Sequence, residues 1–331
     1  MASFHYKQLH TDAKASLQHF GNTASKLILI YAGVSLGISA LLTLISYALD
    51  VAISGTSGLA AIDTVAFLET VETFLRTLQT IAAPFWSIGY LYAIMQTARQ
   101  QSADSVNLLN GFRHFGPVLR TTFLRLAIYF ALIMVGAQLA GLVFMITPDA
   151  KELIAQTEAL MQNSQTPDYE ALLSNDAYMS AMMPAIPYMV VGALLPLIPL
   201  FYRMRMMDYV LMDQPRNGAF YAFGRSMRMT RKQCLQIFKV DLHFWWFYLL
   251  ELLTLAICFG DLLLPMLGIA LPMDPTLAAF VFYAVGLLCQ FGLYMWKQNE
   301  VSATYALLYD ALRQESIPAP QPARASVPWN Y

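Results

Sequence analysis

The sequence predicts an all-α fold: a polytopic helical membrane protein with about six transmembrane helices. Of the 331 residues, 57% are hydrophobic and only 12% are charged, and the mean hydropathy is +0.49. A soluble chain carries roughly 25% charged residues, so half that share indicates that lipid covers much of the surface. The second observation is a set of long apolar runs, and the third is the one-sided distribution of basic residues between them.

The apolar runs have the length that a bilayer requires. A hydrocarbon core of about 30 Å needs about 20 mostly apolar residues in a helix, and six runs meet this requirement. Lipid offers no hydrogen bonds to the backbone, and the runs are too long for the strands of a barrel, so each is predicted to be a helix. The predicted spans are residues 27–49, 78–98, 126–146, 183–202, 242–260 and 277–296.

The basic residues set the predicted orientation. If the six spans alternate in direction, 18 of the 20 Lys and Arg residues fall on one side, and only Arg76 and Lys151 fall on the other. Cytoplasmic loops hold an excess of Lys and Arg, so both termini are predicted to be cytoplasmic. The first run is longer than the apolar region of a signal peptide, which has about 7 to 15 residues. It is therefore predicted to be a permanent span.

The predicted organisation is one helical membrane domain over residues 1–313 and a disordered, Pro-rich cytoplasmic tail over 314–331. An acidic outer loop covers 147–182, and a basic cytoplasmic loop covers 203–241. The outer loop contains two similar helix starts, Thr147-Pro148-Asp149 and Thr166-Pro167-Asp168. Thr is a good cap, Pro suits the first helical position, and Asp favours the positive end of a helix, so two short helices are expected there.

Amphipathic helices are predicted at the cytoplasmic interface. Stretches 6–20, 105–115 and 220–238 each precede a pair of spans, which gives the chain the pattern of three helical hairpins. After the sixth span, four apolar residues recur at helical spacing and form one stripe. This last helix is predicted to lie on the membrane. The stripe consists of Val301, Tyr305, Leu308 and Leu312.

Catalytic motifs are absent from the sequence. It contains no His-Glu-x-x-His, no Cys-x-x-Cys and no phosphate-binding Gly-Lys-Ser/Thr loop. The segment from Gly33 to Gly37 (GVSLG) fits the nucleophile-elbow pattern, but that elbow requires a turn from strand to helix. The same two glycines fit the small-xxx-small rule for close helix packing, which is the interpretation preferred here. The sequence therefore predicts no enzyme, no cofactor and no metal site.

Glu251 is the candidate intramembrane polar site. It lies at the midpoint of the fifth span, where an ionised carboxylate costs about 2.5 to 3.5 kcal/mol on insertion scales. Two interpretations stay open at this point. Glu251 is either a proton or cation site in a transport path, or a neutral packing group that hydrogen-bonds Gln138, Gln290 or a backbone carbonyl. The prolines of the fourth span, which include Pro187 and Pro196, also fit either a broken transporter helix or a kinked structural one.

The basic loop 203–241 is predicted to bind anionic lipid head groups. It holds eight basic residues against three acidic ones, interleaved with aromatic residues. Each base near an anionic membrane surface contributes about 1 kcal/mol. The loop lacks a nucleic-acid-binding motif, and the net charge of the chain is −1, so no nucleic-acid partner is expected. The candidate lipid contacts are Arg203, Arg205, Arg225, Arg228, Arg231 and Lys232.

Several segments resemble one family of bacterial integral membrane proteins, the domain of unknown function 975. The similar segments are 7–30, 108–120, 209–215 (YVLMDQP), 224–227 (GRSM), 238–244 (FKVDLHF), 252–255 (LLTL) and 303–310 (ATYALLYD). The sequence departs from the family pattern in two places: Glu251 stands where the family has a small residue, and the passage 260–294 is longer. The resemblance implies a multi-pass bacterial membrane protein without an established activity, and it carries over no catalytic residue.

These observations favour a non-enzymatic protein of the bacterial cytoplasmic membrane that acts in envelope maintenance or as a membrane partner or scaffold. The alternative is a secondary transporter or exporter of a small solute or lipid, for which Glu251 and the prolines of the fourth span speak. The expected partners are membrane lipids. A protein partner or a homo-oligomer is left open.

Overall fold

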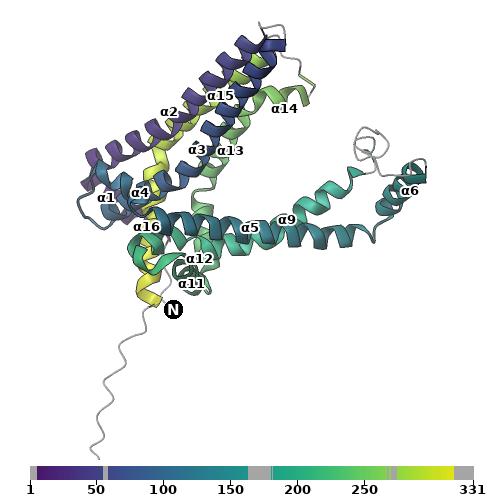
Figure 1. Cartoon of the computed structure of the whole chain (residues 1–331). Helices are drawn as coiled ribbons and strands as arrows, with labels where there is room; N and C mark the ends of the chain where they lie inside the picture. Colours follow the sequence, from purple (N-terminus) through teal and green to yellow (C-terminus); the bar gives the residue numbers. More distant parts are fainter. Residues whose placement is uncertain are drawn as a thin grey trace, which may run out of the picture. The chain divides into compact units, whose positions relative to one another are not determined.

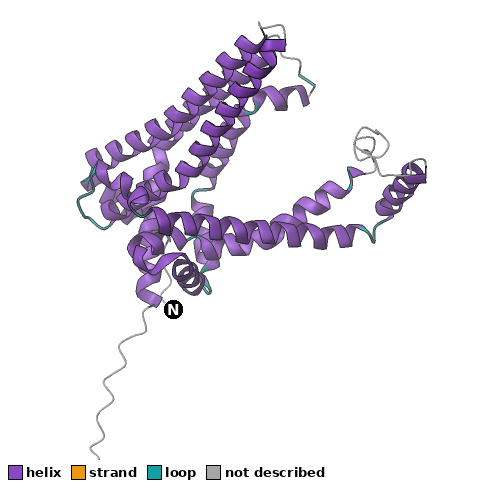
Figure 2. Cartoon of the chain, in the orientation of Figure 1, coloured by secondary structure: helices purple, strands orange, loops and turns teal. Residues whose placement is uncertain are grey.

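The computed structural model describes residues 6–54, 59–162, 180, 182–266, 268–269 and 274–316. Within these residues every regular element is helical and none is a strand (Figure 2). The predicted all-α class is confirmed. The chain divides into two compact units: a first unit formed by Met1–Arg120 with Met206–Tyr331, and a second formed by Thr121–Arg205.

The first unit contains most of the helices. In chain order they are α1 (Tyr6–His19), α2 (Gly21–Ser54), α3 (Leu59–Ala98), η1 (Ser105–Leu109), α4 (Asn110–Arg113), α10 (Met207–Asp213), η2 (Pro215–Asn217), α11 (Gly218–Thr230), α12 (Cys234–His243), α13 (Trp245–Cys258), α14 (Gly260–Met266), α15 (Pro275–Leu293), η3 (Tyr294–Gln298) and α16 (Asn299–Ser316). The predicted helices at 6–20 and 220–238 correspond to α1 and to α11 with α12. Stretch 105–115 forms the short helices η1 and α4 instead of one helix.

Four long helices of the first unit form a bundle. α2 packs against α3 and α15, and α15 packs against α13, so these helices run side by side (Figure 1). At one end of the bundle α16 contacts α1, α3 and α11. At the other end α14 packs against α15. The bundle thus has a broad end built from several short helices and a narrow end closed by α14.

Two glycines let η1 and α4 lie directly on α3. A Cβ added to Gly89 would lie 1.8 Å from the carbonyl oxygen of Leu108, and one added to Gly111 would lie 1.8 Å from that of Phe85. Backbone touches backbone at both points, which only glycine permits. The Phe85 ring also stacks on Phe115, with centroids 4.7 Å apart and planes within 4°.

The apolar stripe after the sixth predicted span is a helical face, as expected, but its partner differs. All four stripe residues are buried, at most 5% exposed, because α16 packs against α1 and α3. The prediction that this apolar face lies against the membrane is therefore wrong. Protein covers the stripe, and the helix continues α15 through the turn η3.

The second unit is a helical hairpin with one added helix. It contains most of α5 (Phe115–Phe144), then α6 (Pro148–Gln162) and α9 (Ala185–Met204). α6 begins at Pro148 with Asp149 in its first turn, as predicted, whereas the Thr147 hydroxyl donates back to the Phe144 carbonyl at 2.6 Å. The second predicted helix start, at 166–168, lies outside the described residues. α9 is one continuous helix despite Pro196 and Pro199.

Among the described residues, four helices are long and apolar enough to cross a membrane, and a fifth qualifies if a bent pair forms one span. The bent pair is α12 with α13, which meet at 66°. The predicted span 78–98 forms the second half of α3 and is not among these candidates. The four candidate helices are Gly21–Ala48, Phe115–Phe144, Ala185–Asp213 and Leu277–Glu315. These helices are compatible with a multi-pass membrane protein, while the count of six and the orientation stay predictions. Most of the predicted tail, 317–331, lies outside the described residues.

Candidate functional site

Glu251 is hydrogen-bonded across the bundle. It lies half-buried on α13, and the Tyr294 hydroxyl donates to its Oε1 at 3.3 Å. The Gln290 side-chain amide donates in turn to the Tyr294 hydroxyl at 3.0 Å. Of the two glutamines predicted as partners, Gln290 is thus one hydrogen bond removed, and Gln138 belongs to the second unit. Tyr294 is the direct partner, and it was not predicted because no local pattern in a sequence marks a contact between two helices.

Tyr294 opens the π-helical turn η3, which joins α15 to α16. A π turn is wider than an α-helical turn, and such turns recur at functional sites. Its sequence, YMWKQ, carries no Gly or Pro that would have predicted it. The turn places the only carboxylate of the predicted span 242–260 beside an irregular piece of backbone. A hydroxyl that both donates and accepts can hold two helices together, and it can also pass a proton.

A polar and aromatic layer joins the same turn to α2 and α3. Asn299 accepts a hydrogen bond from the Tyr90 hydroxyl at 2.7 Å and donates to the Ala24 carbonyl at 3.0 Å. The Tyr90 ring stacks on Tyr31 with centroids 4.3 Å apart. The Trp86 indole donates to the Tyr31 carbonyl at 3.1 Å. Every polar group named here has a partner on another helix or on the neighbouring turn, so the layer stabilises the bundle.

An ion-pair cluster fixes the end of α3. The Arg99 guanidinium donates to both carboxylate oxygens of Asp310, at 2.9 and 2.5 Å, and to Asp213 at 3.2 Å. Arg313 lies 2.7 Å from the second oxygen of Asp213. The hydrogen bonds to Asp310 raise the pKa of Arg99 above its already high value, so its charge is permanent. Two-pronged pairs of this kind are stronger than single contacts.

A second polar cluster joins α1, α12, α13 and α16. Asp241 accepts hydrogen bonds from the hydroxyls of Tyr248 and Tyr305. Glu300 lies 2.6 Å from the Lys297 ammonium and 3.3 Å from the His10 imidazole. Asp213, Asp241, Tyr305 and Asp310 each hold neighbouring helices together.

The described residues include no group of three or more His, Cys, Asp or Glu side chains arranged to hold a metal ion. Cys234, Cys258 and Cys289 are free thiols. The polar groups described above are therefore amides, hydroxyls, carboxylates and bases that pair with one another.

The predicted lipid contacts divide between the units. Arg225, Arg228, Arg231 and Lys232 lie on α11 and the turn after it, and the last three are exposed. Arg203 and Arg205 end α9 in the second unit, where the Arg205 guanidinium lies over the Phe201 ring at 5.0 Å. The structure thus brings four of the six residues together.

Exposed apolar side chains accompany these bases. Phe220 is 79% exposed, Leu235 77% and Trp245 58%, and Lys239 is exposed on the same helix as Leu235. We call the exposed side chains of Phe220, Arg228, Arg231, Lys232, Leu235, Lys239 and Trp245 the basic-apolar surface. Leu235 and Lys239 were missed from sequence, although their spacing of four residues places them on one helical face.

Among the described residues, no other helix approaches Gly33 or Gly37 closely. A Cβ added at either position would meet nothing within 4 Å, so this prediction is wrong within the described residues. Two serines of the same span do touch α3. The Ser39 hydroxyl accepts from the Gln79 side-chain amide at 2.5 Å, and the Ser46 hydroxyl accepts from Arg76 Nη2 at 2.7 Å. Close backbone approaches occur at Gly89 and Gly111 instead.

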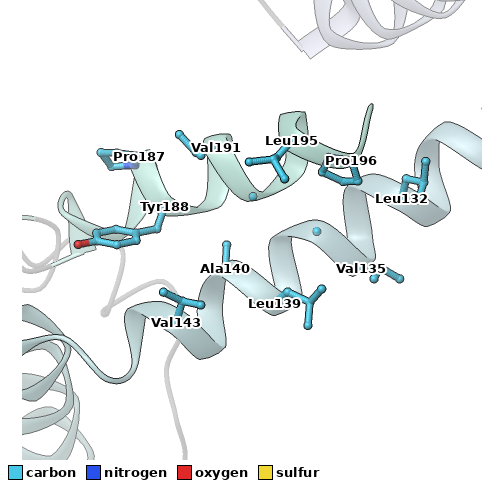
Figure 3. Close-up of a pocket in the computed structure, with 12 residues that line it drawn as sticks. Leu132, Val135, Leu139, Ala140, Val143, Pro187, Tyr188, Val191, Leu195 and Pro196 are labelled. Atoms are coloured by element: carbon cyan, nitrogen blue, oxygen red, sulfur yellow. The ribbon is translucent and has the colours of Figure 1, made fainter. Parts of the chain in front are cut away.

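The second unit contains an apolar groove of about 570 Å³ between α5 and α9. The two helices meet closely at Gly136 and Gly192, since a Cβ on Gly136 would lie 2.2 Å from the Gly192 carbonyl. Leu139 and Val143 of α5 and Val191 and Leu195 of α9 are among the residues that line the groove (Figure 3). These walls offer no charge that would select a ligand.

No protein-family model, curated protein or solved structure matches this chain. The resemblance to the domain of unknown function 975 therefore stays a prediction based on the segments quoted above.

Proposed function

We propose that this chain is a six-span protein of the bacterial cytoplasmic membrane with both termini in the cytoplasm, related to the domain of unknown function 975. In this proposal it is not an enzyme. It acts as a membrane partner or scaffold in envelope maintenance, and its cytoplasmic face holds anionic lipid.

The basic-apolar surface is the observation that carries the proposal. Arg231 and Lys232 are exposed on the turn just before α12, and Leu235 in the first turn of that helix is 77% exposed. Water penalises such apolar exposure, whereas a bilayer interface accepts both the apolar side chain and the charge. The polar clusters around Arg99 and Asp241 hold neighbouring helices together, which suits a fixed platform better than a moving gate.

Lipid binding by the full chain tests this proposal. The protein is placed in nanodiscs of phosphatidylcholine with or without phosphatidylglycerol, and retained anionic lipid is counted by native mass spectrometry. The variant Arg231→Gln/Lys232→Gln should weaken retention by about 1 kcal/mol per base, and raised salt should weaken it further. The control Lys151→Gln removes an exposed charge from α6, which the proposal places on the outer side, and should leave this retention unchanged. Equal losses in both variants, or binding that salt does not change, would contradict the proposal.

Cysteine labelling tests the orientation. In a cysteine-free background, a reagent that does not cross membranes should label a Cys at Glu152 in α6 from outside and spare one at Asn217 in η2, since both positions are exposed. Labelling with the opposite pattern would overturn the orientation.

A secondary transporter or exporter of a small solute or lipid is the second candidate. The observation that favours it is the chain Glu251–Tyr294–Gln290 beside the π-helical turn. Proteoliposomes loaded with a pH-sensitive dye test it under an imposed potential. A proton flux of the parent protein that is lost in Glu251→Gln supports transport. Equal fluxes in the parent protein and in Glu251→Gln show that Glu251 carries no protons and support the scaffold.

A further inference from the structure

A pocket of about 510 Å³ lies at the α14 end of the four-helix bundle in the first unit. Residues of α2, α3, α13 to α14 and α15 line it. The volume falls in the range of small-molecule sites, which is about 300 to 1,000 Å³. Neither the scaffold proposal nor the transporter alternative uses this pocket.

The pocket contains a fixed guanidinium. Arg76 donates through Nε to Glu72 and through Nη2 to the Ser46 hydroxyl, each at 2.7 Å. Hydrogen bonds from Ser46 and Arg76 hold the pKa of Glu72 below its usual value, so Glu72 stays ionised and keeps Arg76 in place. Within the described part of the chain, Nη1 of Arg76 has no hydrogen-bond partner, and the side chain is 47% exposed. Among the described residues, nothing occupies this edge of the guanidinium, which has the geometry to bind an anion.

A carboxylate of opposite charge lines the same pocket. Asp261, at the start of α14, is half-buried. Among the described residues it forms no ion pair, with Arg76 or with any other base. Arg76, which is paired with Glu72, and Asp261 thus line one pocket without pairing with each other. A ligand that carries only one charge would satisfy one of them and leave the other to be desolvated at a cost.

Aromatic side chains supply the apolar walls. The rings of Tyr47 and Phe280 lie 4.8 Å apart on facing helices, and Tyr283 lines the pocket from α15. The backbones of α13 and α15 approach closely beside them, because a Cβ on Gly286 would lie 2.2 Å from the Cys258 sulfur. Packed helices therefore build the walls before any ligand arrives.

We propose that this pocket binds a zwitterion, with its phosphate or carboxylate on Arg76, its ammonium on Asp261 and its carbon atoms against Tyr47 and Phe280. Guanidinium pairs well with phosphate and carboxylate, and a carboxylate accepts all the hydrogen bonds that an ammonium offers. The chemistry comes from two sources, the head group of an ethanolamine phospholipid or a free solute such as phosphoethanolamine.

Two binding measurements on the full chain distinguish the sources. Radiolabelled phosphoethanolamine probes the free solute on the detergent-purified protein. Native mass spectrometry after nanodiscs of mixed phosphatidylethanolamine and phosphatidylglycerol probes the lipid. Binding of either ligand that is lost about tenfold in both Arg76→Gln and Asp261→Asn supports the proposal, as expected when one charge-assisted contact is removed. Loss of the lipid alone identifies a head-group site, and loss of the solute alone identifies a solute site.

Matched variants protect the test from indirect effects. Arg76→Gln also breaks the contacts to Glu72 and Ser46, but Asp261→Asn keeps its shape and disturbs no ion pair of the described residues, so it should fold normally. Lys151→Gln and Asp149→Asn remove the same charges from α6 in the second unit and should leave binding unchanged. The proposal fails if neither ligand binds, or if Asp261→Asn binds both ligands as tightly as the parent protein. The lipid-surface bases are untouched in all four variants, so the outcome does not depend on the proposed function.

Discussion

The Tyr294 hydroxyl donates a hydrogen bond to Glu251 across the bundle, and this contact ties α13 to the junction of α15 and η3. A carboxyl group at this depth is costly unless it is hydrogen-bonded. Tyr294 meets that requirement without a basic residue, and Gln290 in turn supplies a donor to Tyr294. The contact accounts for Glu251 as a packing group, and it also provides the first step that a proton path would need.

Substitutions at Glu251 and Tyr294 measure this contact. Glu251→Gln keeps the shape and the hydrogen-bonding capacity, so the free energy of unfolding should stay nearly unchanged. Glu251→Leu and Tyr294→Phe should each lose at most about 1 to 2 kcal/mol, the size of interhelical hydrogen bonds in membranes. Thermal unfolding in one detergent provides the measurement, with Tyr92→Phe as a control that removes a half-buried hydroxyl from α3.

The double variant Glu251→Leu/Tyr294→Phe separates the pair from its surroundings. If the two residues act on each other, their combined effect should fall short of the sum by about 0.6 kcal/mol. Strict additivity would show that the hydrogen bond contributes nothing. A stable Glu251→Gln protein that abolishes the phenotype of the gene would favour transport over packing.

Arg99 should be the most sensitive base of the first unit. Arg99→Ala leaves Asp213 and Asp310 close together without their shared cation, and the expected loss is about 3 kcal/mol. Arg99→Lys keeps the charge but loses the two-pronged contact, so a smaller loss of about 1 to 2 kcal/mol is expected. Arg216→Ala, at an exposed position in η2, should change stability by less than about 0.5 kcal/mol. Equal effects at the two arginines would contradict a structural role for the cluster.

The same cluster has a defined pH dependence on the alkaline side. A base whose pKa is raised in the folded state adds stability that is complete below its unfolded pKa and is lost only as pH rises through the folded value. For Arg99 both values lie above about 12, so unfolding midpoints measured between pH 7 and 10 should show no loss due to this residue. In Arg99→Lys the ordinary pKa is about 10.4, and a decline that begins near pH 10 is expected. If the unfolding midpoint of the parent protein falls in this pH range and Arg99→Lys shows the same fall, groups other than Arg99 cause it.

Local patterns in the sequence predicted the helices well and their partners poorly. The i, i+4, i+7 and i+11 spacing correctly placed Val301, Tyr305, Leu308 and Leu312 on one face. The spacing of apolar residues predicts that one face of a helix is apolar, but it does not predict whether lipid or protein covers that face. The stripe packs against α1 and α3, two helices that are far from it in the sequence.

The candidate sites show the same limit. The bases of 203–241 were identified from composition, since lipid contact requires only charge near the interface. Pairs such as Glu251 with Tyr294, or Arg99 with Asp310, depend on how separate helices are placed against one another. A single sequence holds no local signal for such contacts. The π-helical turn η3 was missed for a related reason, because its five residues are compatible with an ordinary helix.

Glycine substitutions test where backbones truly touch. At Gly89 an added methyl group would lie 1.8 Å from the Leu108 carbonyl, so Gly89→Ala must push η1 away from α3. Overpacking of this kind costs about 1 to 3 kcal/mol. Gly33→Ala and Gly37→Ala meet open space and should be neutral or stabilising by up to about 1 kcal/mol, because Ala favours helix. Destabilisation at Gly33 or Gly37 as large as at Gly89 would reveal a contact with another molecule at that face.

Gln100 offers a stabilising substitution at the end of α3. Its φ is +58°, a left-handed conformation that side chains other than Gly adopt at a cost. The backbone N–H of Gln100 donates to the Thr97 carbonyl at 3.0 Å, and the backbone N–H of Gln101 donates to the Gln96 carbonyl at 2.9 Å. This is the Schellman pattern, in which Gly usually occupies the left-handed position. Gln100→Gly should therefore stabilise the protein by about 0.5 to 1 kcal/mol.

The neighbouring residue provides the control for this prediction. Gln101 is also exposed, but its φ is not positive. Gln101→Gly relieves no strain and adds freedom to the unfolded chain, so it should leave stability unchanged or lower it by up to about 1 kcal/mol. Both midpoints are measured by thermal unfolding in the same detergent. Arg99 directly precedes the cap, so its ion pairs could hold Gln100 in the strained conformation. In that case Gln100→Gly should add less stability to the Arg99→Ala protein than to the parent protein. A full gain in that background would show that the cap forms without them.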